Sequence, residues 1–236
     1  MDLLFLDTET TDLDEHAQLV QLAYKDSKSG ETMNAYFKPS VPISFGAMAV
    51  HHVTEKMVAD KPAFEGSEAQ QKLQTFLVDH LVVAHNALFD IRVLKTEGLT
   101  IDRFIDTLRV AKHLIPSEQY KLQYLRYSLD LDAEGMPHDA MGDVMVLESL
   151  FKYLCGVIEE KFSLTEEDAI IHKMIELTHL PVRLATFGFG KYVNKKFEDV
   201  SAMDRGYLEW LFASETKKII SEQNEDLVYT LKHFLQ

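Results

Sequence analysis

Several things are scarce in this sequence, and each scarcity excludes a class of protein. The 236 residues contain a single cysteine, Cys155, so an intrachain disulfide is impossible. No apolar run approaches the roughly 18 residues that cross a bilayer. The N-terminus also lacks the basic segment that precedes the apolar core of a signal peptide. These features predict a soluble, cytoplasmic protein with no membrane partner.

Positive charge is scarce as well. The chain has 24 Lys and Arg against 38 Asp and Glu, which gives a net charge of −14. This balance argues against a protein that attracts nucleic acid through a general positive charge on its surface. A nucleic-acid enzyme is not excluded, because divalent cations and local basic patches can supply the attraction. The apolar content of 46% is ordinary for a globular protein, and the length allows one good core with a small second module.

The pattern of apolar runs and turn residues predicts an α/β layout. Strand-like segments lie at 2–6, 17–26, 31–39, 81–85 and 103–107. Helical patterns lie at 43–58, 67–80, 87–98, 107–114, 121–129 and 139–160. The first three strands are joined by short connections, which predicts an antiparallel meander, and the later strands alternate with helices. We therefore expect a mixed sheet flanked by helices.

Carboxylates follow the apolar runs in a way that needs an explanation. Asp7 and Glu9, in "MDLLFLDTETTDL", come directly after the first run. Residues at i and i+2 of a strand point to the same side, so the two charges would lie side by side. Asp90 follows the buried run "LVVAH", and "PHDAMGD" places His138 and Asp143 at the start of the long helix.

A shared site would explain these acids. Four carboxylates converging without cations would repel one another by several kcal/mol. Oxygen ligands without a cysteine or histidine set favour Mg²⁺ or Mn²⁺ over Zn²⁺. Two such ions about 3.5–4 Å apart stabilise both oxygens in a phosphodiester displacement. The residues therefore predict a two-ion metal site.

Three motifs, "FLDTETTDL", "VAHNALFD" and "HDAMGD", resemble the exonuclease motifs of the DnaQ-like superfamily, in the DEDDh branch that carries a histidine in its third motif. The resemblance runs from residue 3 to about residue 155. The segment "FGFGKYVNKKFEDVSAMDRGYLEWLF" resembles the C-terminal region of one member, so nearly the whole chain is covered. The implied fold is ribonuclease H-like, a mixed five-stranded sheet flanked by helices, with a small C-terminal module added.

The resemblance also implies a role for individual residues. Asp7, Glu9 and Asp143 match the direct metal ligands, Asp90 matches the carboxylate that completes the second metal's shell, and His138 matches the general base. The implied substrate contacts are Thr8, Thr10 and Leu13, with His85 and Asn86 as further candidates for which a structural role is the alternative. Asp12 departs from the family pattern, which usually has glycine at this position.

The expected organisation is an exonuclease domain at 1–162, a helical joint at 163–185 and a glycine- and aromatic-rich module at 186–236 that is a candidate nucleic-acid contact. The expected function is metal-dependent 3′→5′ hydrolysis of DNA that releases nucleoside 5′-monophosphates. The alternatives are an RNA 3′-processing exonuclease of the same superfamily and, in a different class, an inactive nucleic-acid-binding scaffold. The expected partner is single-stranded DNA or a DNA 3′ end.

Overall fold

The computed structural model describes residues 1–132 and 136–236 and divides the chain into two compact units, Met1–Thr178 and His179–Gln236. The division falls inside residues 163–185, the segment expected to be a helical joint. The two units are described separately below.

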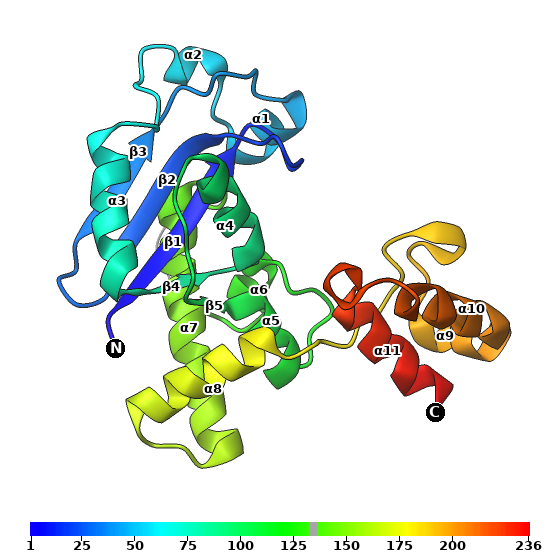
Figure 1. Cartoon of the computed structure of the whole chain (residues 1–236). Helices are drawn as coiled ribbons and strands as arrows, with labels where there is room; N and C mark the ends of the chain where they lie inside the picture. The colour runs from blue at the N-terminus through cyan, green and yellow to red at the C-terminus, as the bar shows by residue number, and fades with distance from the viewer. Residues whose placement is uncertain (133–135) are drawn as a thin grey trace. The chain divides into compact units, whose positions relative to one another are not determined.

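The first unit is built on a five-stranded mixed sheet (Figure 1). Its strands are β1 (Leu3–Thr10), β2 (Leu19–Asp26), β3 (Thr32–Tyr36), β4 (Leu81–Ala84) and β5 (Phe104–Asp106), in the order β3-β2-β1-β4-β5. β1, β2 and β3 pair antiparallel, whereas β4 runs parallel to β1 and β5 parallel to β4. The predicted meander and mixed sheet are confirmed.

β1 extends further than the apolar run alone predicts. Its pairing with β2 continues through both acids, with Asp7 opposite Ala23 and Glu9 opposite Gln21, and it shifts register only between Glu9 and Thr10. The ladder with β2 therefore holds the two carboxylates on regular strand backbone, and their side chains point to the same face of the sheet.

Each face of the sheet carries its own apolar core. On one face, Leu4, Leu6 and Tyr24 pack against α3 (Glu68–Asp79) and α4 (Ala87–Thr96). On the other, Leu3 and Phe5 pack against α7 (Ala140–Phe162). Strand residues alternate between the two cores as the period of two requires. Asp7 and Glu9 continue the series of Leu3 and Phe5, so they face α7.

The remaining helices of this unit are short, apart from α8. They are α1 (Phe45–His51), α2 (Glu55–Val58), α5 (Thr107–Leu114), α6 (Leu122–Ser128) and α8 (Glu167–His179). α8 contributes Ile170, Ile171 and Met174 to the core beneath α7. Within residues 1–132 and 136–236, no helix is long and apolar enough to cross a membrane.

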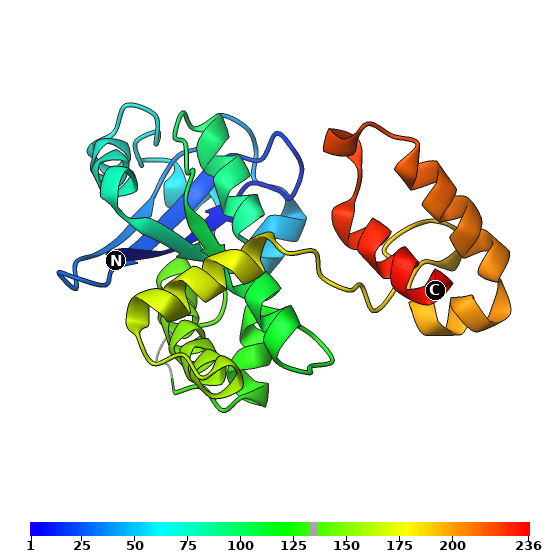
Figure 2. The same cartoon turned by 60° about the horizontal axis from the view of Figure 1, so that its bottom comes forward.

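The second unit consists of short helices and connecting turns (Figure 2), and it has a small apolar core of its own. Its helices are α9 (Phe197–Met203), α10 (Arg205–Thr216) and α11 (Glu225–Leu235), with short 3₁₀ turns at Gly190–Tyr192 and Ile220–Glu222. Phe187 and Phe197 stack at its centre with ring centroids 3.8 Å apart. Gly190 has a φ of +73°, and a Cβ there would meet the Tyr207 hydroxyl, so glycine is required at this turn.

Candidate metal centre and active site

Three carboxylates from two elements converge at the carboxyl end of β1. The donor oxygens of Asp7, Glu9 and Asp143 all lie within 4.8 Å of one another. Asp7 and Glu9 come from β1, and Asp143 lies one turn into α7, the helix that packs on the same face of the sheet. An all-oxygen donor set of this size fits Mg²⁺ or Mn²⁺, each of which takes one or two carboxylates together with water and phosphate oxygens.

Two of the acids are held by neighbouring side chains. The Thr8 hydroxyl donates to Oδ1 of the buried Asp90 at 2.6 Å, and so ties α4 to β1. The Gln123 amide of α6 donates to Oδ1 of Asp143. Nothing in the sequence pattern pointed to Gln123, because it lies on a different helix, 20 positions from its partner.

The electrostatics of the cluster are those of a site that binds cations. Burial and the neighbouring carboxylates raise the pKa of Asp7 well above its ordinary range and raise that of Glu9 to about 8. Burial raises the pKa of Asp90 to about 7, although the Thr8 hydroxyl acts in the opposite direction. Burial also raises the pKa of Asp143. Without cations, the folded protein therefore favours protonated acids here.

His138 lies beside this cluster in the turn that leads into α7. Its side chain is exposed, its φ of 59° is left-handed, and it stands next to Asp139, the N-cap of α7. Its charge and a backbone hydrogen bond lower the pKa of Asp143, against the larger effect of burial. Gly142 allows the turn to pack closely on the helix, because a Cβ there would collide with the carbonyl oxygen of Met136.

An apolar cavity of about 270 Å³ adjoins the acids. Its lining includes Glu9, Thr8, Thr10, Asp12, Leu13, Ser44, Val50, His51 and Phe89. The cavity therefore brings three of the predicted substrate contacts, Thr8, Thr10 and Leu13, next to a candidate metal ligand. His51 accepts the Val53 N–H at Nδ1 (3.0 Å), which leaves Nε2 to donate to the Thr10 carbonyl oxygen (3.1 Å).

The two further candidates lie outside this cavity lining. His85 hydrogen-bonds through Nδ1 to the Thr107 hydroxyl and through Nε2 to the Tyr120 carbonyl oxygen, so both ring nitrogens are used internally. This geometry supports the structural alternative for His85. Asn86 has a φ of 69° and starts α4, with its N–H donating to Asp106, while its side chain is exposed.

The structure also shows what Asp12 does in place of glycine. It is not among the described non-glycine residues with positive φ. Its carboxylate accepts the N–H of Leu13 at 2.7 Å, and its carbonyl oxygen accepts the Thr10 hydroxyl at 2.7 Å. Asp12 therefore stabilises the turn that presents Leu13, whose side chain is 77% exposed.

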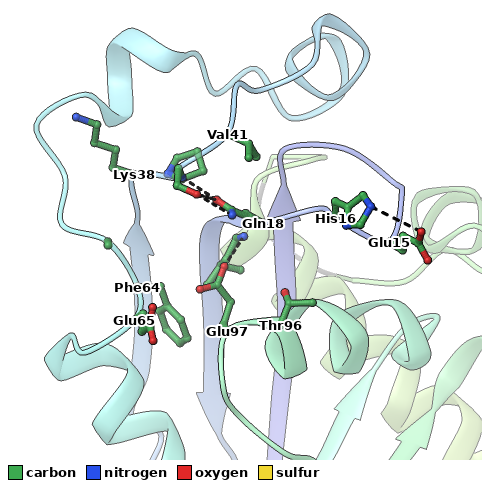
Figure 3. Close-up of a pocket in the computed structure, with 13 residues that line it drawn as sticks. Glu15, His16, Gln18, Lys38, Val41, Phe64, Glu65, Thr96 and Glu97 are labelled. Atoms are coloured by element: carbon green, nitrogen blue, oxygen red, sulfur yellow. Dashed lines mark hydrogen bonds and ion pairs between the residues drawn. The ribbon is translucent and has the colours of Figure 1, made fainter.

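A larger cavity, of about 740 Å³, is shown in Figure 3, and none of the predicted metal ligands lines it. Glu15, Glu65 and Glu97 line it, together with Lys38 and His16. Glu97 is already used to accept the Leu19 N–H, and Gln18 is bonded to Ser40. With more carboxylates than cations, this cavity is a poor place for a phosphate backbone.

The raised pKa values predict an unusual dependence of stability on pH in the metal-free protein. Glu9 has a pKa of about 8 when folded against an ordinary value of 4.5. The folded state therefore binds more protons between these values, and the free energy of unfolding should fall as pH rises from about 4.5 to 8. Chemical denaturation in EDTA across this range measures the effect, and the Glu9→Gln variant should flatten it. A wild-type curve that matches the variant's would contradict the assignment.

The chain is similar to known proteins in both sequence and structure. Residues 4–151 match the exonuclease family of the RNase T type. The chain is 32% identical over 241 aligned residues to exodeoxyribonuclease 10 of Escherichia coli (strain K12), with 99% of each chain covered. It matches the solved structure of exonuclease X in complex with 5′-overhanging duplex DNA with a TM-score of 0.55 and 29% identity, over 75% of this chain and 99% of that one.

A third match, to E. coli exonuclease I in complex with a dT13 oligonucleotide, has a TM-score of 0.56 at 19% identity and covers 69% of this chain and 42% of that one; it shows the common fold alone. The predicted ribonuclease H-like fold is thereby confirmed. The family match over residues 4–151 and the full-length likeness to an exodeoxyribonuclease show that this chain belongs to the exonuclease family.

Proposed function

We propose that this protein is a divalent-metal-dependent 3′→5′ exonuclease that hydrolyses DNA to nucleoside 5′-monophosphates. The observation that carries the proposal is the cluster of Asp7, Glu9 and Asp143 beside an apolar cavity large enough to hold part of a nucleotide. DNA is favoured as substrate because the relative with full-length likeness is an exodeoxyribonuclease and because the structure of exonuclease X contains duplex DNA with a 5′ overhang.

In this proposal each residue has one task. Asp7, Glu9 and Asp143, with Asp90, would hold two Mg²⁺ or Mn²⁺ ions. When bound, the ions would stabilise the attacking and leaving oxygens of the displacement. His138 would accept a proton from the attacking water, whose oxygen bonds to phosphorus while the bond to the preceding 3′ oxygen breaks. Thr8 and Gln123 keep Asp90 and Asp143 in place through their hydrogen bonds.

The cavity would receive the 3′-terminal nucleotide. Leu13, Val50 and Phe89 give it an apolar wall on which a base can pack, and Thr8 and Thr10 line it as well. An apolar wall can pack against any of the four bases, because every base has a flat face. We therefore expect little sequence preference at the terminal position.

One experiment separates the proposed function from its alternatives. Single-stranded DNA, duplex DNA and single-stranded RNA, each labelled at either end, are incubated with Mg²⁺, Mn²⁺ or EDTA. The proposal expects release of mononucleotides from the 3′ end of DNA and none in EDTA. Faster degradation of RNA would favour the RNA-processing alternative, and binding without cleavage would favour the inactive scaffold.

The second unit is proposed to contact the DNA strand. It carries eight Lys and Arg and eight Asp and Glu, so the whole net charge of −14 belongs to residues 1–178. Phe187 is in its core, whereas Phe189 and Trp210 are 46% and 61% exposed. Lys195 and Lys196 are exposed as well, while Lys191 is paired with Asp204 at 3.0 Å. Exposed rings and cations together are suited to single strands.

Substitution of Trp210 tests this contact. Trp210→Ala should raise KM for long single-stranded DNA by about 5-fold or more, because base stacking contributes about 1–3 kcal/mol. Hydrolysis of a mononucleotide ester, which reaches only the acid cluster, should be unchanged. Lys195→Ala with Lys196→Ala should make the salt dependence of oligonucleotide binding shallower, and Lys217→Ala, another exposed lysine of this unit, is the control. Equal losses on both substrates would contradict a binding role.

A further inference from the structure

Gln21 is a buried polar side chain in the middle of β2, where the sequence is otherwise apolar. Its exposed fraction is 0%, and its neighbours Val20 and Leu22 belong to the apolar cores. It stands directly opposite Glu9 in the antiparallel ladder, so both side chains point to the face that α7 covers. A buried amide costs free energy unless its hydrogen bonds are made, so its partners indicate why it is there.

The Gln21 amide nitrogen links β2 to β3 and to the N-terminus of α7. Nε2 donates to Oδ1 of Asn34 on β3 at 2.8 Å and to Oδ1 of Asp139 at 2.9 Å. The other carboxylate oxygen of Asp139 accepts the Gly142 N–H at 3.2 Å and so caps α7. One carboxylate therefore connects the sheet to the first turn of the helix that carries Asp143.

A glutamine at this position does not give the core the stability that an apolar side chain would give. Oε1 of Gln21 is buried and has no hydrogen-bond partner among the residues that the structure describes. A buried acceptor left unpaired costs about 1–3 kcal/mol, and an apolar side chain of the same size would avoid that cost. The retained amide is therefore better explained by the position it imposes on Asp139 than by stability.

Asp139 is next to His138 in the chain. The turn that contains His138 is also confined by its contact with α7. The close approach of Met136 to Gly142 leaves no room for a Cβ. The turn is thus held by Gln21 through Asp139 and by the helix surface at Gly142. His138, which is exposed and has left-handed backbone, takes its position from this frame.

We propose that Gln21 is a positioning residue that acts through Asp139 to hold His138 at its working distance from the acids of β1. The inference rests on the proposed role of His138 as general base. A displacement of about 1 Å in a reacting group can cost about 100-fold in rate. Gln21→Met, which keeps the volume and removes the amide, should therefore lower kcat by about 10- to 100-fold while KM for DNA changes little.

The deciding measurement is a double-mutant cycle. In a His138→Ala background, Gln21→Met should cause no further loss of kcat, because the group it positions is gone. Mn²⁺ affinity, measured by calorimetry, should stay close to wild type in Gln21→Met, and the melting temperature should not fall below that of the wild type. Gln70→Met is the matched control, since Gln70 also forms an amide link, from α3 to the Glu97 carbonyl oxygen at 2.6 Å, away from the acids; its kcat should be unchanged.

Asp139→Ser keeps a good N-cap but is too short to reach Gln21, and it should reproduce the loss of kcat if Gln21→Met does not fold. A wild-type kcat in Gln21→Met would overturn the inference. If Gln21→Met does not fold, a wild-type kcat in Asp139→Ser would overturn it instead. So would losses that multiply with His138→Ala, or a loss of Mn²⁺ binding in Gln21→Met. Failure of the proposed function would look different, because the wild type would then not cleave DNA at all, and failure of the general-base role would leave His138→Ala with the wild-type rate.

Discussion

Replacing Asp7 with asparagine is expected to lower kcat for DNA cleavage by about 10³-fold or more, because removal of one member of a catalytic unit forfeits most of its effect. Asp7 is one of the three acids of the cluster, with its donor oxygen within 4.8 Å of those of Glu9 and Asp143. Steady-state rates on a 5′-labelled oligonucleotide at saturating Mg²⁺ measure the loss. Cleavage at the wild-type rate would show that the cluster is not the active site.

The same substitution should leave the metal-free protein as stable as wild type or more stable. Burial and four neighbouring acids raise the pKa of Asp7 well above its ordinary value, so its ionised form is disfavoured in the folded state. Melting curves in EDTA and in Mn²⁺ test this. Wild type should gain melting temperature with Mn²⁺ by mass action, and Asp7→Asn should gain less. Asp102→Asn, an exposed acid elsewhere, should behave as wild type in both assays.

Replacing His138 with alanine should lower kcat by about 10²–10⁴-fold, the usual contribution of a general base. His138 lies at the entrance to α7, close enough to Asp143 to lower its pKa in part, yet it is not in the cluster of candidate ligands. Metal binding should therefore persist in the variant, as measured by calorimetry with Mn²⁺. Activity should recover partly at higher pH, where hydroxide is more abundant.

His16→Ala provides the control for His138, since His16 is an exposed histidine that pairs with Glu15 outside the acid cluster. Its kcat and pH profile should match those of the wild type. If His138→Ala abolished Mn²⁺ binding, His138 would be a ligand and another group would have to accept the proton from water. If it changed neither rate nor pH profile, the general base would have to be sought elsewhere.

The sequence by itself determined the sheet, the helices up to residue 160 and the identity of the acidic residues, whereas the helices α9, α10 and α11 of the second unit were not predicted. Apolar runs and turn residues are local signals, and they were sufficient for the five strands and for the mixed sheet. Asp7, Glu9, Asp90, His138 and Asp143 could be named because they stand at fixed distances from strand ends and helix starts. Their family motifs then assigned them roles.

Only the tertiary structure decided which polar groups meet around these acids. Gln21 and Asp139 are 118 positions apart, and Thr8 and Asp90 are 82 apart, so no window of the sequence contains either pair. The same holds for His85, whose bonds to Thr107 and Tyr120 depend on how β4 lies against α5 and the loop before α6. Gln21 was not singled out from the sequence, although it is a polar residue between the apolar residues Val20 and Leu22. Its partners were set by the packing of α7 across the sheet, because a hydrogen bond requires atoms within about 3 Å and chain separation carries no information about that distance.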